Sequence, residues 1–108
     1  MFTVVLSEAA KTDIRQNTIW WSRHRSVEQA ERWYVGIVET IYSLAQMPKR
    51  WPQAPEASKL KLDIRNALFG ISSRPTHRIL FEVDGETVNV FRVLHMSQTT
   101  IEDQDDLS

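Results

Sequence analysis

The sequence has 108 residues, of which 42% are hydrophobic and 25% are charged, with a formal net charge of −1 and no cysteine. This composition predicts one globular domain, and it excludes disulfides, thiolate metal sites and an apolar segment long enough to span a membrane. Four acidic residues lie in the last seven positions, and without them 13 basic residues face 10 acidic ones, a balance of +3. We therefore expect a mildly basic domain over residues 1–98 and an acidic, disordered tail over residues 99–108.

The start of the chain has the pattern of a strand followed by a helix. Residues 2–6 form a short β-branched, apolar run that lacks the features of an export signal, so we expect a first strand in a cytoplasmic protein. Ser7 is a good N-cap residue, and Glu8 stands where its charge favours the helix dipole. Apolar residues then recur at three- and four-residue steps as far as Trp21, which predicts a helix that ends within residues 22–25.

A second helix follows, with the most regular helical pattern in the sequence. Ser26 and Gln29 match a capping box, and apolar residues keep helical spacing from Ala30 to Ala45. Pro48 is expected to end this helix. Because few residues separate the two helices, they should pack as an antiparallel hairpin whose shared apolar stripe lies on a sheet.

The second half of the chain has the pattern of three strands. Three prolines predict an irregular loop over residues 47–56, and alternating Lys and Leu residues then predict a strand over residues 58–70. Residues 74–96 form a hairpin pattern around Asp84 and Gly85, a pair that favours a tight two-residue turn. The fold class is therefore α+β in two layers, with an N-terminal strand, a helical hairpin and a three-stranded antiparallel meander, and the first strand is free to pair beside the last.

Cationic and titratable groups are concentrated on the predicted hairpin, which indicates an anionic partner for the sheet. These groups are Arg74, His77, Arg78, Arg92 and His95. Arg78 and Arg92 have the alternative interpretation of an exposed, charged sheet face, and His95 that of a plain residue at a strand end. No metal-ligand spacing, Gly-rich phosphate loop or Ser/His/Asp arrangement is present, so we expect no cofactor and no metal.

Two further groups of residues are candidates for binding. Lys59, Lys61, Arg65 and Arg92 are candidates for contact with nucleic acid or another target, although alternating Lys and Leu residues also occur on any half-buried strand. The second group contains tryptophans, which serve more often as core or partner-facing anchors than as stacking platforms for bases. We expect a protein partner to contact Trp20, Trp21 and Trp33.

Four segments of the sequence together form a recognisable pattern. They are VVLSEAA at residues 4–10 with Asp13 and Ile14, IYSLAQMP at residues 41–48, RILFEV at residues 78–83, and the run at residues 88–94 followed by His95. These segments resemble the RelE/ParE superfamily of bacterial toxins from type II toxin-antitoxin systems, also called plasmid stabilisation proteins. Their order and spacing cover nearly the whole chain. The resemblance implies an antiparallel sheet with a helical hairpin on one face, in agreement with the fold predicted above.

The resemblance also implies two alternative activities. RelE-like members cleave mRNA in the ribosomal A site without a metal, whereas ParE-like members inhibit DNA gyrase, and an antitoxin neutralises both. A RelE-like activity would make Arg74, Arg78 and His95 the catalytic residues, with the ribosome and mRNA as target. Met96 stands where several such nucleases resemble one another in having Tyr, so the set is incomplete. We therefore expect a ParE-like gyrase inhibitor, with a RelE-like endonuclease or a non-toxic binding module of the same fold as alternatives.

Overall fold

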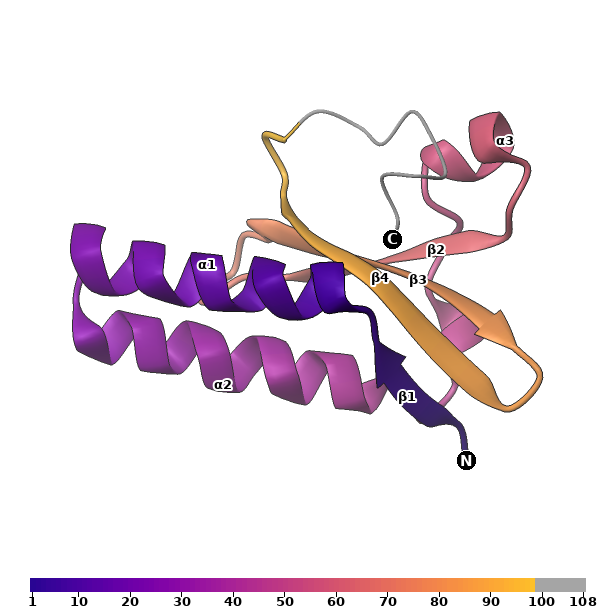
Figure 1. Ribbon diagram of the computed structural model, residues 1–108, viewed down its shortest axis with the longest axis horizontal. Coiled ribbons are helices and arrows are strands. Elements are labelled where there is room, and N and C mark those ends of the chain that lie inside the picture. Colours follow the sequence, from indigo (N-terminus) through magenta and orange to yellow (C-terminus); the bar gives the residue numbers. More distant parts are fainter. Residues whose placement is uncertain (99–108) are drawn as a thin grey trace.

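The computed structural model describes residues 1–98, and the expected acidic tail at residues 99–108 lies outside the described part of the chain. Figure 1 shows a twisted sheet with a long helical hairpin packed on one face, which confirms the predicted α+β class. No helix within residues 1–98 is long and apolar enough to cross a membrane. The elements in chain order are β1 (Thr3–Leu6), α1 (Glu8–His24), α2 (Val27–Ser43), the 3-10 helix η1 (Pro48–Arg50), α3 (Glu56–Leu60), β2 (Ile64–Phe69), β3 (His77–Asp84) and β4 (Thr87–His95).

The sheet has the order β1-β4-β3-β2. Strands β2, β3 and β4 form the predicted antiparallel meander, and β1 pairs in parallel with β4, as expected for a first strand beside the last. The two-residue loop of the β3–β4 hairpin is formed by Gly85 and Glu86, one residue later than predicted, because Asp84 still pairs with Thr87. Gly85 supplies the positive φ of 59° that this turn requires.

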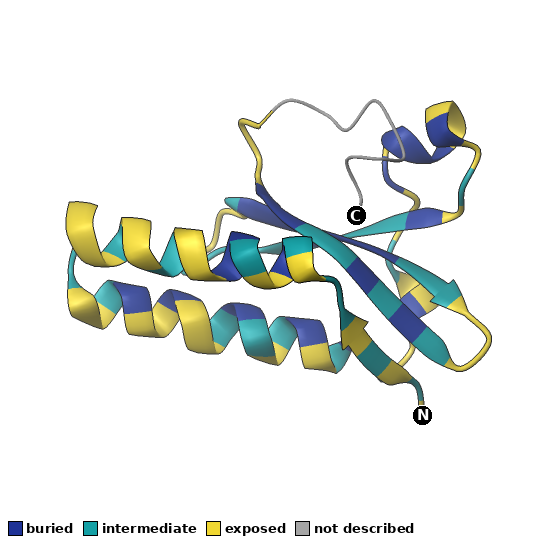
Figure 2. Cartoon of the chain, in the orientation of Figure 1, coloured by how far each residue is buried: buried dark blue, intermediate teal, exposed yellow. Residues whose placement is uncertain are grey.

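The main core lies between the helical hairpin and one face of the sheet. Ser7 and Ser26 cap α1 and α2 by accepting hydrogen bonds from the amides three residues later, as their positions predicted. The buried face of α2 carries Trp33 and Ile37, which belong to the same cluster as Phe81 of β3. Figure 2 shows these buried stripes facing the sheet, with exposed residues on the outer faces of both helices.

Gly36 of α2 lies against the ring of Phe69 in β2. A Cβ atom at this position would lie 2.4 Å from that ring. A larger residue would therefore require the Phe69 side chain to move. Contrary to expectation, Pro48 does not end α2, because the helix already ends at Ser43 and Pro48 begins η1. The chain turns there, and the Ala45 carbonyl accepts a hydrogen bond from the Phe2 amide before β1.

The opposite face of the sheet carries a second, smaller core. It contains Leu60, Ile64, Leu80 and Leu94, and the short helix α3 contributes to it. The predicted strand over residues 58–70 is therefore wrong in its first part, because that part is α3, and only Ile64–Phe69 pair as a strand. A period of two in so short a stretch does not distinguish a strand from a helical turn followed by a left-handed residue, which here is Lys61 with φ 57°.

Candidate functional site

Arg78 forms a buried ion pair with Glu56 and is neither an exposed charge nor a free cation. The two side chains make two parallel hydrogen bonds, of which the bond from Nη1 to Oε1 is 2.9 Å long. Arg78 is 6% exposed and Glu56 is 3% exposed. Because the guanidinium is enclosed by α3 and matched by a carboxylate, an incoming phosphate would have to displace a buried partner to reach it.

His95 lies on the other face of the sheet from Arg78. His95 pairs with His77 across β3 and β4, and their rings are 5.1 Å apart in an edge-to-face arrangement. His77 contacts Trp33 of α2 and therefore faces the helical hairpin, whereas its neighbour Arg78 faces α3. The structure therefore does not bring Arg78 and His95 together.

A β-bulge determines this separation. Near the turn, Asp84 pairs with Thr87 and Phe81 with Val90, but Leu80 pairs with Arg92 because the register shifts by one residue between Leu80 and Phe81. A shift of one residue moves every later side chain of β4 to the opposite face. Without it, His95 would share a face with Arg78.

The remaining residues of the proposed catalytic set are also dispersed. Arg74 is exposed in the loop before β3. Met96 follows β4 with 48% of its surface exposed. Neither residue makes a hydrogen bond or ion pair with Arg78 or Glu56, so the described residues provide no single location where a base, an acid and two phosphate-binding cations converge.

Arg92 is held by α1 rather than displayed on the sheet. Its Nε donates to Asp13 Oδ2 over 2.7 Å and its Nη2 donates to Asp13 Oδ1 over 2.9 Å. The Val93 amide also donates to Asp13 Oδ2 over 2.9 Å. Asp13 thus accepts a hydrogen bond from a backbone amide of β4 that lies beyond the part of β4 paired with β1. These hydrogen bonds explain why a carboxylate is nearly fully buried here. Sequence reasoning did not predict this pairing.

The other predicted target-binding residues do not form one stripe. Lys59 lies on α3, Lys61 is its C-terminal cap, and Arg65 is in β2. Arg65 donates to the Trp51 carbonyl over 2.7 Å, so its guanidinium helps to hold the loop before α3 against β2. A common role of these residues in binding a target therefore remains a prediction that their positions do not favour.

The three tryptophans predicted to contact a partner have different environments. Trp33 is fully buried, so the prediction that it contacts a partner is wrong, and the indole serves the core instead. Trp20 is 44% exposed, and Trp21 is half-buried. Helical spacing alone did not distinguish the buried tryptophan from the exposed one. Trp20 lies on α1 and Trp33 on α2, and the way the two helices pack on each other and on the sheet decides which face of each is buried.

His77 is the centre of a buried polar network between the helices and the sheet. The Trp33 indole donates from Nε1 to His77 Nδ1 over 3.3 Å, and His77 Nε2 lies 2.9 Å from Asn17 Oδ1. Because an indole can only donate, Nδ1 must accept and Nε2 must carry the proton. Burial, assisted by the nearby His95, lowers the pKa of His77 from 6.5 to about 4. His77 is therefore neutral at physiological pH.

We expect the stability of the domain to fall when the pH is lowered from about 6.5 to about 4. In this window the unfolded chain binds a proton at His77 and the folded chain does not, so the free energy of unfolding should fall by about 1.4 kcal/mol per pH unit. The loss should approach about 3 kcal/mol near pH 4. Urea denaturation at a series of pH values would measure it.

The matched control for this prediction is the exposed neighbour His95. His77→Gln should flatten the profile between about pH 6.5 and 4, whereas His95→Gln should keep most of the slope, because burial is the larger cause of the lowered pKa. An unchanged slope in His77→Gln would show that another group is responsible.

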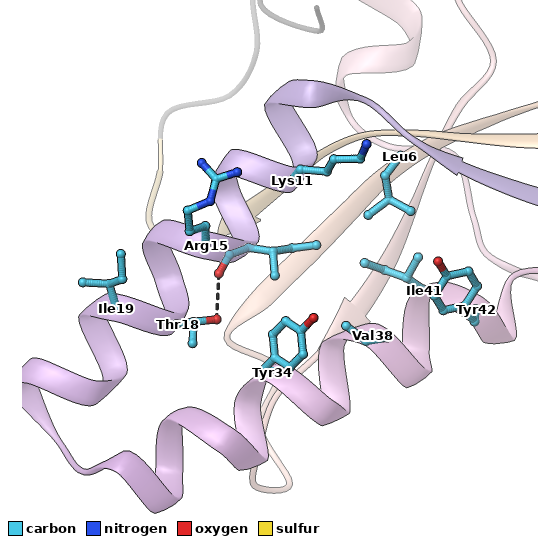
Figure 3. Close-up of a pocket in the computed structure, with 10 residues that line it drawn as sticks. Leu6, Lys11, Arg15, Thr18, Ile19, Tyr34, Val38, Ile41 and Tyr42 are labelled. Atoms are coloured by element: carbon cyan, nitrogen blue, oxygen red, sulfur yellow. Dashed lines mark hydrogen bonds between the residues drawn. The ribbon is translucent and has the colours of Figure 1, made fainter.

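A groove of about 450 Å³ lies between α1 and α2 (Figure 3). Helix α2 contributes Tyr34, Val38 and Tyr42 at four-residue steps, and α1 contributes the cations Lys11 and Arg15. Sequence reasoning placed Tyr34 and Val38 on the stripe that faces the sheet. The signal that was missed is the width of the apolar arc on α2, which is larger than one sheet-facing stripe needs.

Within residues 1–98, no group of three or more His, Cys, Asp or Glu side chains is placed to hold a metal ion.

Comparison with known proteins gives a family match over most of the chain. The model of a family described as "ParE toxin of type II toxin-antitoxin system, parDE" matches residues 4–100. Among solved structures, the chain is similar to one titled "Chromosomal ParDE TA system from P. aeruginosa", with a TM-score of 0.70 and 19% sequence identity. The similarity covers 88% of this chain and 96% of that chain, and it supports the same fold. No curated protein matches the sequence.

Proposed function

Since this chain belongs to the ParE toxin family of type II toxin-antitoxin systems, we propose that it inhibits DNA gyrase and does not cleave RNA. The observation that supports this proposal is the separation of Arg78 from His95 on opposite faces of the sheet, with Arg78 enclosed in an ion pair. Metal-independent RNA cleavage needs an acid, a base and phosphate-binding cations at one place. The described residues do not provide that arrangement.

Expression of the toxin in growing cells without its antitoxin tests the proposal. We expect growth arrest with induction of the DNA damage response, while messenger RNA on ribosomes stays intact. His95→Ala should be as toxic as the unaltered protein, because His95 has no catalytic role in this account. Codon-specific cuts in messenger RNA that disappear in His95→Ala would instead establish the endonuclease. Absence of any growth effect would favour a non-toxic binding module.

Membership of this family implies a cognate antitoxin as partner, and we propose that a helix of the antitoxin occupies the groove between α1 and α2. Residues that line the groove follow helical steps on both walls, which suits an amphipathic helix laid along it. Tyr34 and Tyr42 are 49% and 57% exposed, and Ile19 on the opposite wall is 42% exposed. Large apolar and aromatic residues exposed along one groove are typical of an interface whose partner is absent.

The charges of the groove indicate the chemistry of the antitoxin segment. The charged residues that line it are Lys11 and Arg15, both basic. Lys11 forms an exposed ion pair of 3.3 Å with Glu8. The Arg15 side chain projects from α1 with its guanidinium on the side away from α2 (Figure 3). We therefore expect an apolar helix flanked by Asp or Glu, as charge complementarity requires.

A further inference from the structure

A second cleft, of about 500 Å³, lies at the end of the molecule where α1 ends, β3 begins and β4 ends. It is separate from the groove between the helices, because the two share no lining residue. It is also on the opposite face of the sheet from the Arg78 ion pair. Its volume is within the range of pockets that hold small ligands. The residues that shape it are Trp20, Trp21, Arg25, Thr76, His77 and His95.

The floor of this cleft is a fixed polar network. His77 is held by Trp33, Asn17 and Thr76, whose hydroxyl lies 2.8 Å from Nδ1. Both ring nitrogens of His77 are thereby engaged, so this residue shapes the cleft rather than titrating or reacting in it. Because this hydrogen-bond network is already complete, it keeps the side chains around it in position without a ligand.

The walls of the cleft are aromatic. The Trp20 and Trp21 indoles meet edge to face with their centres 5.5 Å apart, and nearly half of the Trp20 surface is exposed. The Arg25 guanidinium lies 5.7 Å from the centre of the Trp20 ring. The His24 ring stacks on Trp20 with the ring centres 4.9 Å apart. The exposed remainder of Trp20, beside the half-buried Trp21 and an arginine, is a surface on which a further planar ring can stack.

Hydrogen-bond donors lie at the rim of the cleft, and no Asp or Glu among the described residues that line it pairs with them. Within residues 1–98, Arg25 has no carboxylate partner, and no acidic side chain lines the cleft. His95 accepts the Ser97 amide at Nδ1 over 3.0 Å, so its proton is on Nε2, where no partner occurs among the described residues. Arg23 and His24 lie immediately before Arg25 and add to the basic character of this end.

We propose that this cleft binds a phosphorylated nucleoside, with its base against the Trp20 and Trp21 indoles and its phosphate at Arg25 and His95. A planar ring joined to an anion matches the aromatic walls and the unmatched donors together, whereas an apolar ligand would leave the donors unused. The same chemistry occurs in a free mononucleotide and in an unpaired nucleotide of a single strand. A base inside a duplex cannot reach the indoles, because it is stacked and paired. This inference is independent of gyrase inhibition.

Titration of the purified protein with a fluorescently labelled oligo(dT) strand of twelve nucleotides tests the proposal. We expect saturable binding that weakens with salt, with a slope near −0.7 for each phosphate neutralised. Trp20→Ala should weaken binding by about 5- to 100-fold, as expected for the loss of base stacking. Arg25→Ala should also weaken it, and this variant should have the flatter salt dependence.

The matched control is Arg32→Ala, which removes an exposed arginine that lines a different cleft on α2. It should leave the affinity within about twofold of the unaltered protein. Competition by dTMP would show that a free nucleotide is sufficient, and binding of oligo(dT) without competition by dTMP would assign the site to unpaired strands. A blunt duplex of the same length should bind more weakly than the single strand.

Three results would overturn the proposal. The first is no binding of either oligo(dT) or dTMP at millimolar concentration. The second is equal affinity for oligo(dT) in the unaltered, Trp20→Ala and Arg25→Ala proteins. The third is a loss of affinity in Arg32→Ala as large as that in Arg25→Ala. Thermal melting of each variant controls for folding. Since Arg25 is exposed in the loop between two helices, Arg25→Ala tests the cleft even if Trp20→Ala folds poorly.

Discussion

Glu56→Gln is expected to lower the free energy of unfolding by about 3–5 kcal/mol, the largest stability effect that the structure predicts. The change leaves the Arg78 guanidinium buried opposite a neutral amide, although the volume of residue 56 hardly changes. Glu56 holds both nitrogens of that guanidinium with almost no access to solvent. The midpoint of urea denaturation, with the slope checked for two-state behaviour, measures the loss.

Two control variants separate the buried charge from other causes. Glu56→Leu combined with Arg78→Met should recover most of the stability, because replacing a buried ion pair by apolar residues of similar volume is often neutral or favourable. Glu8→Gln breaks the exposed pair with Lys11 and should cost less than about 1 kcal/mol. A Glu56→Gln protein within 1 kcal/mol of the unaltered protein would show that Arg78 finds another partner or reaches water.

Tyr34→Asp is expected to weaken antitoxin binding by about 30-fold or more, which corresponds to the loss of an aromatic residue at the centre of an interface. The substitution removes an aromatic wall of the groove between α1 and α2 and places a carboxylate against the acidic flank expected of the antitoxin. Because Tyr34 is half exposed, the free toxin should fold normally. Isothermal titration calorimetry with the cognate antitoxin measures the change.

Val35→Asp is the matched control for the groove. It introduces the same charge at the next position of α2, at a residue of nearly equal exposure, but it lines a different cleft. It should bind the antitoxin within about threefold of the unaltered toxin. Equal losses in the two variants would place the antitoxin over the outer face of α2 rather than in the groove, and two unaffected variants would exclude α2 altogether.

The elements that the sequence predicted correctly are those specified by local chemistry. Ser7 and Ser26 accept from the amides three residues onward, so a helix begins at each, and Gly85 provides the turn that closes the β3–β4 hairpin. The short helix α3 escaped prediction because tertiary contacts decide it. Glu56 is held by Arg78 of β3, and Leu60 packs in the same cluster as Leu80.

The candidate site was harder to predict because it depends on register. From a turn beside Asp84, a regular hairpin would place His95 and Arg78 on one face, and the nuclease hypothesis would then be geometrically reasonable. The bulge between Leu80 and Phe81 reverses the facing of the last residues of β4. No glycine or proline marks this bulge in the sequence, so residue patterns alone gave no signal for it.

The environment of each cation also required the three-dimensional arrangement. Arg78 and Arg92 have the same appearance in the sequence, two charges on apolar strands. One is buried against Glu56 and the other is held by Asp13 at the edge of β4. Their partners are 22 and 79 residues away along the chain, a separation at which spacing rules carry no information.

Supercoiling of relaxed plasmid DNA by purified gyrase in the presence of this toxin tests the central claim most directly. Increasing toxin should inhibit supercoiling, prior addition of the antitoxin should restore it, and His95→Ala should inhibit as strongly as the unaltered toxin. In parallel, messenger RNA on ribosomes should remain uncut by the same preparation. Full gyrase activity at all toxin concentrations, with messenger cleavage that His95→Ala abolishes, would contradict the account.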